Sequence, residues 1–199
     1  MAEGERRAQI LHAADELFGR RGYAAVSIGE VAAAVGVTKA AIYHHFPSKA
    51  DLYAAVLCQG LRMIAASIRS HDHEPGPTAA KIARMAEIAI VWLKEDADMD
   101  AMMRDAEEHL SATQLAEVAT ADRDRRAAME ELMRAGAARS ELRADVDPAM
   151  LAHSFWHLLD GFVGRRRTVA GFHGSPEVAA AVADLFLHGA SASRPPTGE

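Results

Sequence analysis

Five residues between positions 39 and 49 have the types and spacing of a surface that contacts DNA. Lys39 carries an ammonium group that can donate to guanine acceptors. Tyr43, His44 and Lys49 are donors suited to phosphate oxygens, and the small Ala40 allows a helix to approach base edges closely. A solvated face on a small helical bundle would have the same composition, so spacing alone leaves both interpretations open.

Two short helices joined by a tight turn, within residues 27–46, must hold this surface. Ser27 with Glu30 three residues later predicts a helix start, because hydroxyl and carboxylate can each satisfy a free backbone N–H. Gly36 takes positive φ most easily where the chain reverses. Thr38 is a good N-cap for the second helix, and Pro47 stops it. The pattern predicts a helix-turn-helix.

A longer pattern extends this segment over about the first quarter of the chain. It comprises Arg6-Arg7, Ile10-Leu11, Ala13-Ala14, Leu17-Phe18, Gly22-Tyr23, Val26-Ser27-Ile28, Val31-Ala32, Gly36-Val37-Thr38-Lys39-Ala40-Ala41-Ile42-Tyr43-His44-His45-Phe46, Lys49 and Leu52. This ungapped pattern closely resembles the TetR family. The resemblance implies an all-helical, dimeric transcriptional regulator, usually a repressor that a small ligand releases from its operator.

The resemblance also implies which residues contact DNA. These are Ser27, Lys39, Ala40, Tyr43, His44 and Lys49, with Thr38 heading the recognition helix. Members of the family often have arginine where this chain has Gly29, so one contact from the first helix is expected to be missing. The resemblance therefore leaves operator specificity open.

An all-α fold with two domains and a tail is expected for the 199 residues. The predicted parts are a three-helix helix-turn-helix DNA-binding domain at 1–50, a helical ligand-binding and dimerisation domain at 51–190, and a disordered tail at 191–199. An amphipathic helix over 5–21 precedes the helix-turn-helix. A helix of about 20 residues from Ser48 to Ser70 is predicted to act as a lever, with a hinge at 71–77.

The charge distribution suits a protein that contacts DNA at one end. The net charge is −6, but residues 1–52 hold six basic and six acidic residues, so the acidity lies downstream. The sequence has no apolar run near the roughly 18 residues that a membrane span requires, so a cytoplasmic protein without a membrane partner is expected. The single Cys58 is expected to be a buried, inert thiol.

The middle of the chain is rich in methionine at helical spacing. Helices are predicted over 78–95, 98–110 and 111–136, and such residues are most often core. Flexible thioethers also line adaptable apolar cavities, so they are candidates for an effector pocket. The candidate ligand-binding residues are Trp92, Met99, Met103, Met129 and Phe155.

Two further helices are predicted to start at Asp147-Pro148 and Ser175-Pro176 and to end near residues 167 and 188. Their broad apolar faces need a partner, and small alanines allow close helix contact. We expect a four-helix dimer interface across a two-fold axis, which the family resemblance also implies. Burial inside the same chain is the alternative.

Other functions fit less well. His153 and His157 lie four residues apart, like a helical metal pair, but an interface or pocket-edge role is favoured, and no metal or cofactor is expected. The sequence has no nucleophile–base motif, metal signature or phosphate loop, which disfavours an enzyme. A DNA-binding regulator without a small ligand remains an alternative.

Overall fold

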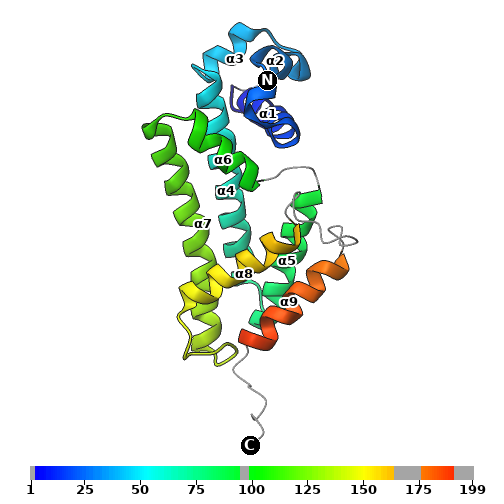
Figure 1. Cartoon of the computed structure of the whole chain (residues 1–199), viewed down its shortest axis with the longest axis vertical. Helices are drawn as coiled ribbons and strands as arrows, with labels where there is room; N and C mark the ends of the chain where they lie inside the picture. Colours follow the sequence, from blue (N-terminus) through cyan, green and yellow to red (C-terminus); the bar gives the residue numbers. More distant parts are fainter. Residues whose placement is uncertain (1–2, 95–98, 164–175, 191–199) are drawn as a thin grey trace, which may run out of the picture. The chain divides into compact units, whose positions relative to one another are not determined.

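The computed structural model describes residues 3–94, 99–163 and 176–190; within these ranges, the side chains of 90–94, 99–101 and 160–163 are not described. In the described ranges the chain forms nine α-helices and no strand (Figure 1). They are α1 (Glu3–Ala25), α2 (Ile28–Val35), α3 (Lys39–His45), α4 (Lys49–His73), α5 (Thr78–Lys94), α6 (Met99–His109), α7 (Ala112–Ala138), α8 (Pro148–Val163) and α9 (Pro176–Ala190). The predicted all-α fold is confirmed.

The helices pack as two compact units. Of the described residues, the first unit comprises 3–62 and 99–122, and the second comprises 63–94, 123–163 and 176–190. The units therefore do not divide at residues 50 and 51, because α4 contributes residues to both and α6 packs with the N-terminal helices. The functional division into residues 1–50 and 51–190 stays a prediction, and the tail at 191–199 lies outside the described residues.

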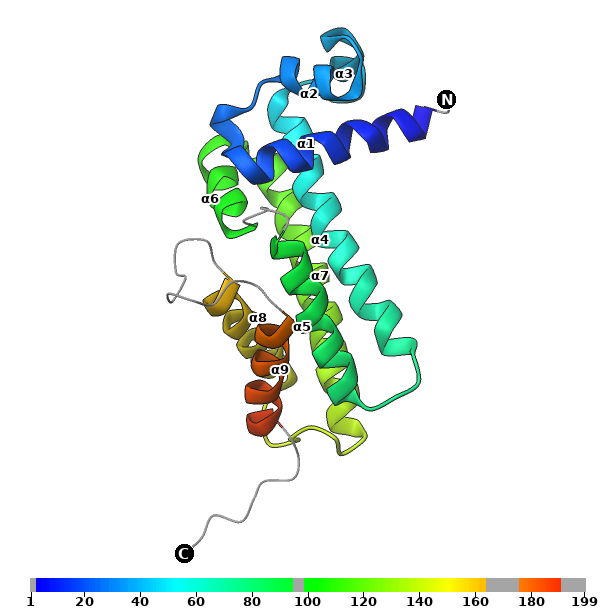
Figure 2. The same ribbon diagram turned by 90° about the vertical axis from the view of Figure 1, so that its right-hand side faces the viewer.

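The core of the first unit forms beneath the two short helices. Ile10, Leu11 and Phe18 of α1 are buried, as the helical periodicity predicts. They share one cluster with Val31 of α2 and Ile42 of α3. In both views α2 and α3 lie side by side (Figures 1 and 2). Apolar packing against the buried side of α3 therefore fixes the orientation of this helix.

The C-terminal part of α1 is hydrogen-bonded to α6, and the sequence did not predict this contact. Gly22 interrupts the helix with φ 77° and ψ 167°, a conformation that glycine adopts at little steric cost. One residue later, the Tyr23 N–H donates to an Asp105 carboxylate oxygen at 2.8 Å. The Tyr53 hydroxyl of α4 donates to the Met102 carbonyl at 2.9 Å. These long-range bonds attach α6 to the N-terminal helices.

The second unit has its own core, in which the last two helices are partly buried. In both views α8 and α9 lie beside α5 (Figures 1 and 2). Leu151, Phe155 and Leu159 of α8 and Val182 and Phe186 of α9 are all buried in the chain's own core. Burial inside the same chain, the alternative interpretation of these apolar faces, is thus observed for these residues. The predicted end of the first of these helices, near 167, lies outside the described residues, and α9 is still helical at Ala190, just beyond its predicted end near 188.

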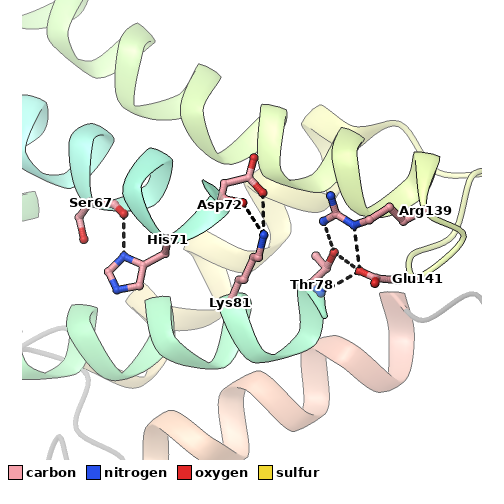
Figure 3. Close-up of polar contacts among 7 residues, drawn as sticks. All are labelled: Ser67, His71, Asp72, Thr78, Lys81, Arg139 and Glu141. Atoms are coloured by element: carbon pink, nitrogen blue, oxygen red, sulfur yellow. Dashed lines mark hydrogen bonds and ion pairs between the residues drawn. The ribbon is translucent and has the colours of Figure 1, made fainter. Parts of the chain in front are cut away.

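The connection between α4 and α5 differs from the predicted hinge. α4 continues to His73, so the non-helical link is shorter than residues 71–77. Figure 3 shows why the helix extends: the buried Lys81 donates to the backbone carbonyl and to the carboxylate of Asp72. The side chain of His71 bonds the Ser67 carbonyl at 2.7 Å. This last turn of α4 is therefore held partly by a partner on the next helix, Lys81, which the periodicity of α4 itself does not indicate.

A second set of polar contacts in Figure 3 fixes the start of α5. The Thr78 backbone N–H donates to Glu141 at 2.8 Å, and the Thr78 hydroxyl bonds the same carboxylate. Arg139 donates to the Thr78 hydroxyl oxygen at 2.8 Å. Gly136 of α7 packs closely against Thr78, since a Cβ on Gly136 would come within 2.8 Å of the Thr78 methyl carbon. Polar contacts therefore hold both ends of the link between α4 and α5: Lys81 with Asp72 at the end of α4, and Glu141 with Thr78 at the start of α5.

α4 is the one helix in the described ranges that is long and apolar enough to cross a membrane by length and composition. Half of its apolar window is buried inside the protein. Leu52, Leu57 and Leu61 belong to the first core cluster and Ile68 to the second. A core helix of a water-soluble protein meets the same criterion, so this finding is weak support for a membrane span.

Candidate nucleic-acid interface

The start of α2 is built by the predicted capping arrangement. The Ser27 N–H donates to the Glu30 carboxylate at 2.8 Å, and the Glu30 N–H donates to the Ser27 hydroxyl oxygen at 3.2 Å. The hydroxyl acts here as an acceptor, so its own hydrogen remains available for a phosphate. Ser27 is exposed.

Arg21 adds a contact to this cap that sequence reasoning missed. Its guanidinium bonds the other oxygen of Glu30 at 2.7 Å and the Ala25 carbonyl at 2.6 Å. The Arg21 hydrogen bond, followed by those from Ser27, lowers the pKa of Glu30 to about 2. The network links the end of α1 to the start of α2. Nothing in the spacing of Arg21 and Glu30 marks them as partners.

The turn and the start of the recognition helix also follow the prediction. Gly36 adopts the left-handed conformation at φ 71° and ψ 36° and closes α2. The Ala41 N–H donates to the Thr38 hydroxyl oxygen at 3.2 Å, which makes Thr38 the N-cap of α3. Ile42 is fully buried and Phe46 nearly so. Caps at both helix starts and an apolar inner edge leave the opposite edge of α3 facing outward.

That outer edge carries most of the predicted DNA contacts. Lys39, Ala40, Tyr43 and His44 are all exposed, and Tyr43 keeps 49% of its surface accessible. Its exposure matters because a large aromatic side chain on a monomer surface is available to a partner. His45, expected on the same edge, is half-buried, and its ring centroid lies 6.4 Å from that of Phe46.

Lys49 is placed differently from the other candidates. It is half-buried at the start of α4, and its ammonium nitrogen lies 4.1 Å from the Tyr23 ring centroid, over the ring. Burial lowers the pKa of Lys49, and the charge of Glu30 opposes this effect. The position over the Tyr23 ring therefore sets Lys49 apart from the exposed candidates on α3.

The ligand candidates do not fall into one cluster. Met129 and Phe155 are fully buried in the core of the second unit. Met103 is half-buried and packs against the core of the first unit. The side chains of Trp92 and Met99 lie outside the described residues. A shared helical period cannot reveal to which of two cores a methionine belongs.

A buried polar atom in the second unit was not anticipated. The Nε1 of Trp156 is inaccessible to solvent and has no hydrogen-bond partner in the described part of the chain. The Arg125 guanidinium carbon lies 4.7 Å from the centroid of its ring. An unpaired buried N–H is energetically costly, which makes this donor unusual among the buried polar atoms of the described residues.

Histidines and acidic residues do not form a metal site in the described ranges. No group of three or more histidine, cysteine, aspartate or glutamate side chains converges there. The rings of His153 and His157 stack edge to face, with centroids 4.1 Å apart, on an exposed side of α8.

Comparison with known proteins agrees with this geometry. The family model described as "Bacterial regulatory proteins, tetR family" matches residues 10–56, which include the whole capped helix-turn-helix. Residues 10–56 therefore form the N-terminal helix-turn-helix region that is typical of the TetR family. Beyond the N-terminal third of the chain, the relationship is seen in the fold alone.

Curated HTH-type transcriptional regulators are similar to part of this chain. The HTH-type transcriptional activator FasR of Mycolicibacterium smegmatis is 45% identical over 65 residues, which are 33% of this chain and 30% of FasR. The HTH-type transcriptional regulator TtgR of Pseudomonas putida is 47% identical over 53 residues, 27% of this chain and 25% of TtgR. The similarity thus spans less than a third of these relatives.

Solved structures extend the TetR fold over nearly the whole chain. The fatty acid degradation regulator FadR of Bacillus halodurans has a TM-score of 0.77 at 20% identity, covering 95% of this chain and 98% of FadR. The TetR-family regulator PfmR of Thermus thermophilus has a TM-score of 0.70 at 24% identity, covering 89% and 96%. At such identities the comparison concerns the fold and not the ligand.

Proposed function

We propose that this TetR-family protein is a dimeric transcriptional repressor that binds a palindromic operator and is released by a small, apolar effector. The observation that carries the proposal is the outer edge of α3. Its exposed donors Lys39, Tyr43 and His44 stand on a helix whose inner edge is fixed by buried Ile42. A rigid helix with donors on one edge suits the major groove.

The test is selection of bound sequences from a random duplex pool by the purified protein. A dimeric reader enriches a palindrome with half-sites separated by about one helical turn or a multiple of it. A pool without any enriched sequence would contradict the proposal.

Two variants separate the roles of the lysines. Lys39→Ala should relax sequence preference, because Lys39 would donate to a base edge. Lys49→Ala should weaken binding to all sequences and reduce the salt slope by about one, because Lys49 would neutralise a phosphate. Equal loss of sequence preference in both variants would contradict this assignment.

The proposed dimer forms through the last two helices. Their inner faces are buried in the chain's own core, so the dimer would use the outer faces instead. Met150 of α8 and Leu185 of α9 keep 61% and 59% of their surfaces exposed, and the small residues Ala180 and Ala181 of α9 are exposed as well. Leu185→Glu should raise the dimer dissociation constant in sedimentation experiments, whereas Met63→Glu on α4 should leave it unchanged.

The effector would bind in the second unit, near Met129, Phe155 and the unpaired Nε1 of Trp156. A ligand that favours one conformation of the dimer by about 3 kcal/mol would weaken operator binding more than a hundredfold. α4 follows directly after the recognition helix and continues to His73 in the second unit. We infer that a shift of this helix changes the spacing of the two recognition helices.

Induction is tested with an operator-controlled reporter and a panel of apolar compounds. Phe155→Leu or Trp156→Phe should change the response to the inducing compound while operator binding without it is preserved. A regulator without a small ligand is the alternative, and a reporter unaffected by every compound would favour it. FasR is named an activator, so the same reporter also decides whether deletion of the protein raises or lowers transcription.

A further inference from the structure

Gly29 is the second residue of α2, at a position where the backbone does not require glycine. Its φ lies outside the left-handed region that Gly22 and Gly36 occupy. A helical glycine costs backbone entropy compared with alanine. Backbone conformation therefore gives no reason for glycine at position 29, and the reason must be sought in what surrounds it.

The neighbour that a side chain at position 29 would meet is Lys39. A Cβ on Gly29 would lie 2.7 Å from the Lys39 Cε and 3.3 Å from its Nζ. The first distance is shorter than carbon atoms approach one another in proteins. The end of the Lys39 side chain thus lies across the start of α2, in space that exists because residue 29 has no side chain.

Lys39 is exposed, and charge does not hold its side chain over α2. In the described part of the chain Lys39 makes no ion pair, and the nearby carboxylate of Glu30 is bonded to Arg21. The first turn of α2 presents N–H groups with partial positive charge, which do not attract an ammonium group. An acceptor on DNA can therefore draw Lys39 away from α2 without breaking a salt bridge.

We propose that Gly29 is a specificity-determining residue that sets the path along which Lys39 reaches the DNA bases. The proposal rests on the proposed function, since it needs a protein that binds DNA in the major groove. A side chain at position 29 closes the space over α2 and forces the ammonium group onto another path. The base preferred at the Lys39 position of each half-site then changes, although residue 29 itself makes no base contact.

The experiment compares bound-sequence selection for the wild type, Gly29→Ala, Lys39→Ala and the double variant. We expect Gly29→Ala to change base preference about fivefold at one position of each half-site, the order of one base-edge contact. In the Lys39→Ala background, Gly29→Ala should have no further effect on preference, because the group it displaces is gone. The salt slope should stay unchanged in Gly29→Ala.

Folding is controlled separately. The only close contact is the flexible end of Lys39, so Gly29→Ala should keep or raise the urea midpoint of unfolding. Gly4→Ala is the matched control, because a Cβ at Gly4 of α1 meets nothing within 4 Å. It should leave sequence preference unchanged.

The outcomes distinguish the two proposals. If the wild type selects a palindrome, Lys39→Ala changes its preference and Gly29→Ala does not, the inference on Gly29 is wrong and the proposed function stands. If Gly29→Ala changes preference equally with and without Lys39, its effect does not pass through Lys39 and the inference is again wrong. A wild type that enriches no sequence contradicts both.

Discussion

The helix-turn-helix segment and the last two helices are both apolar helix pairs, yet they are determined in different ways. In the first pair the starts are fixed by neighbours three residues apart, Ser27 with Glu30 and Thr38 with Ala41. In α8 and α9 the decisive contacts join residues far apart in sequence, such as Phe155 and Phe186, whose ring centroids lie 5.3 Å apart. Local helix caps can be predicted from a sequence, whereas the surface that packs against an apolar helix face cannot.

The largest effect expected from this difference is in the second unit. Phe155 is fully buried, so Phe155→Ala should lower the free energy of unfolding by about 3–5 kcal/mol. The exposed Met63 on α4, outside the proposed dimer faces, is the control, and Met63→Ala should change the free energy of unfolding by less than about 0.5 kcal/mol. Urea unfolding followed by circular dichroism measures both. Similar losses in the two variants would mean that α8 is not packed as described.

A smaller effect is expected from a helix cap. Ser27→Ala removes the acceptor for the Glu30 N–H and should lower the free energy of unfolding by about 1 kcal/mol. Ser27→Asp is the control, because it keeps an acceptor at the same position. A loss as large as that of Phe155→Ala would break the comparison, since the cap would then depend on more than local contacts.

The smallest effect concerns pH. The pKa of Glu30 is about 2 in the folded protein against 4.5 as the ordinary value, chiefly because of Arg21 and then Ser27. A lowered folded-state pKa gives stability that is fully present above pH 4.5 and is lost as the pH falls from 4.5 to 2. Glu30→Gln keeps a capping side chain but cannot titrate, so its unfolding midpoint should depend less on pH in that window. Identical pH profiles for both proteins would exclude this contribution.

The sequence predicted more of the recognition surface on α2 and α3 than of the contacts with α1 and α4 that surround it. Capping, turn and apolar spacing gave α2 and α3 and the outward placement of Lys39, Tyr43 and His44, because these signals act over three or four residues. The position of Lys49 over the Tyr23 ring and the role of Arg21 could not be predicted, because each depends on the break in α1 at Gly22. The extension of α4 beyond Ser70 depends in the same way on Lys81 from the next helix.

By itself, the sequence determined the helical content, the capped helix-turn-helix and the resemblance to the TetR family, since periodicity and caps are properties of neighbouring residues. Tertiary structure alone decided that α6 packs with the N-terminal helices, that Met103 and Met129 belong to different cores, and that the inner faces of α8 and α9 are buried in their own chain. It also decided that Lys39 lies across Gly29. The physical reason is that an apolar or flexible side chain specifies a need for contact but not which distant surface meets it.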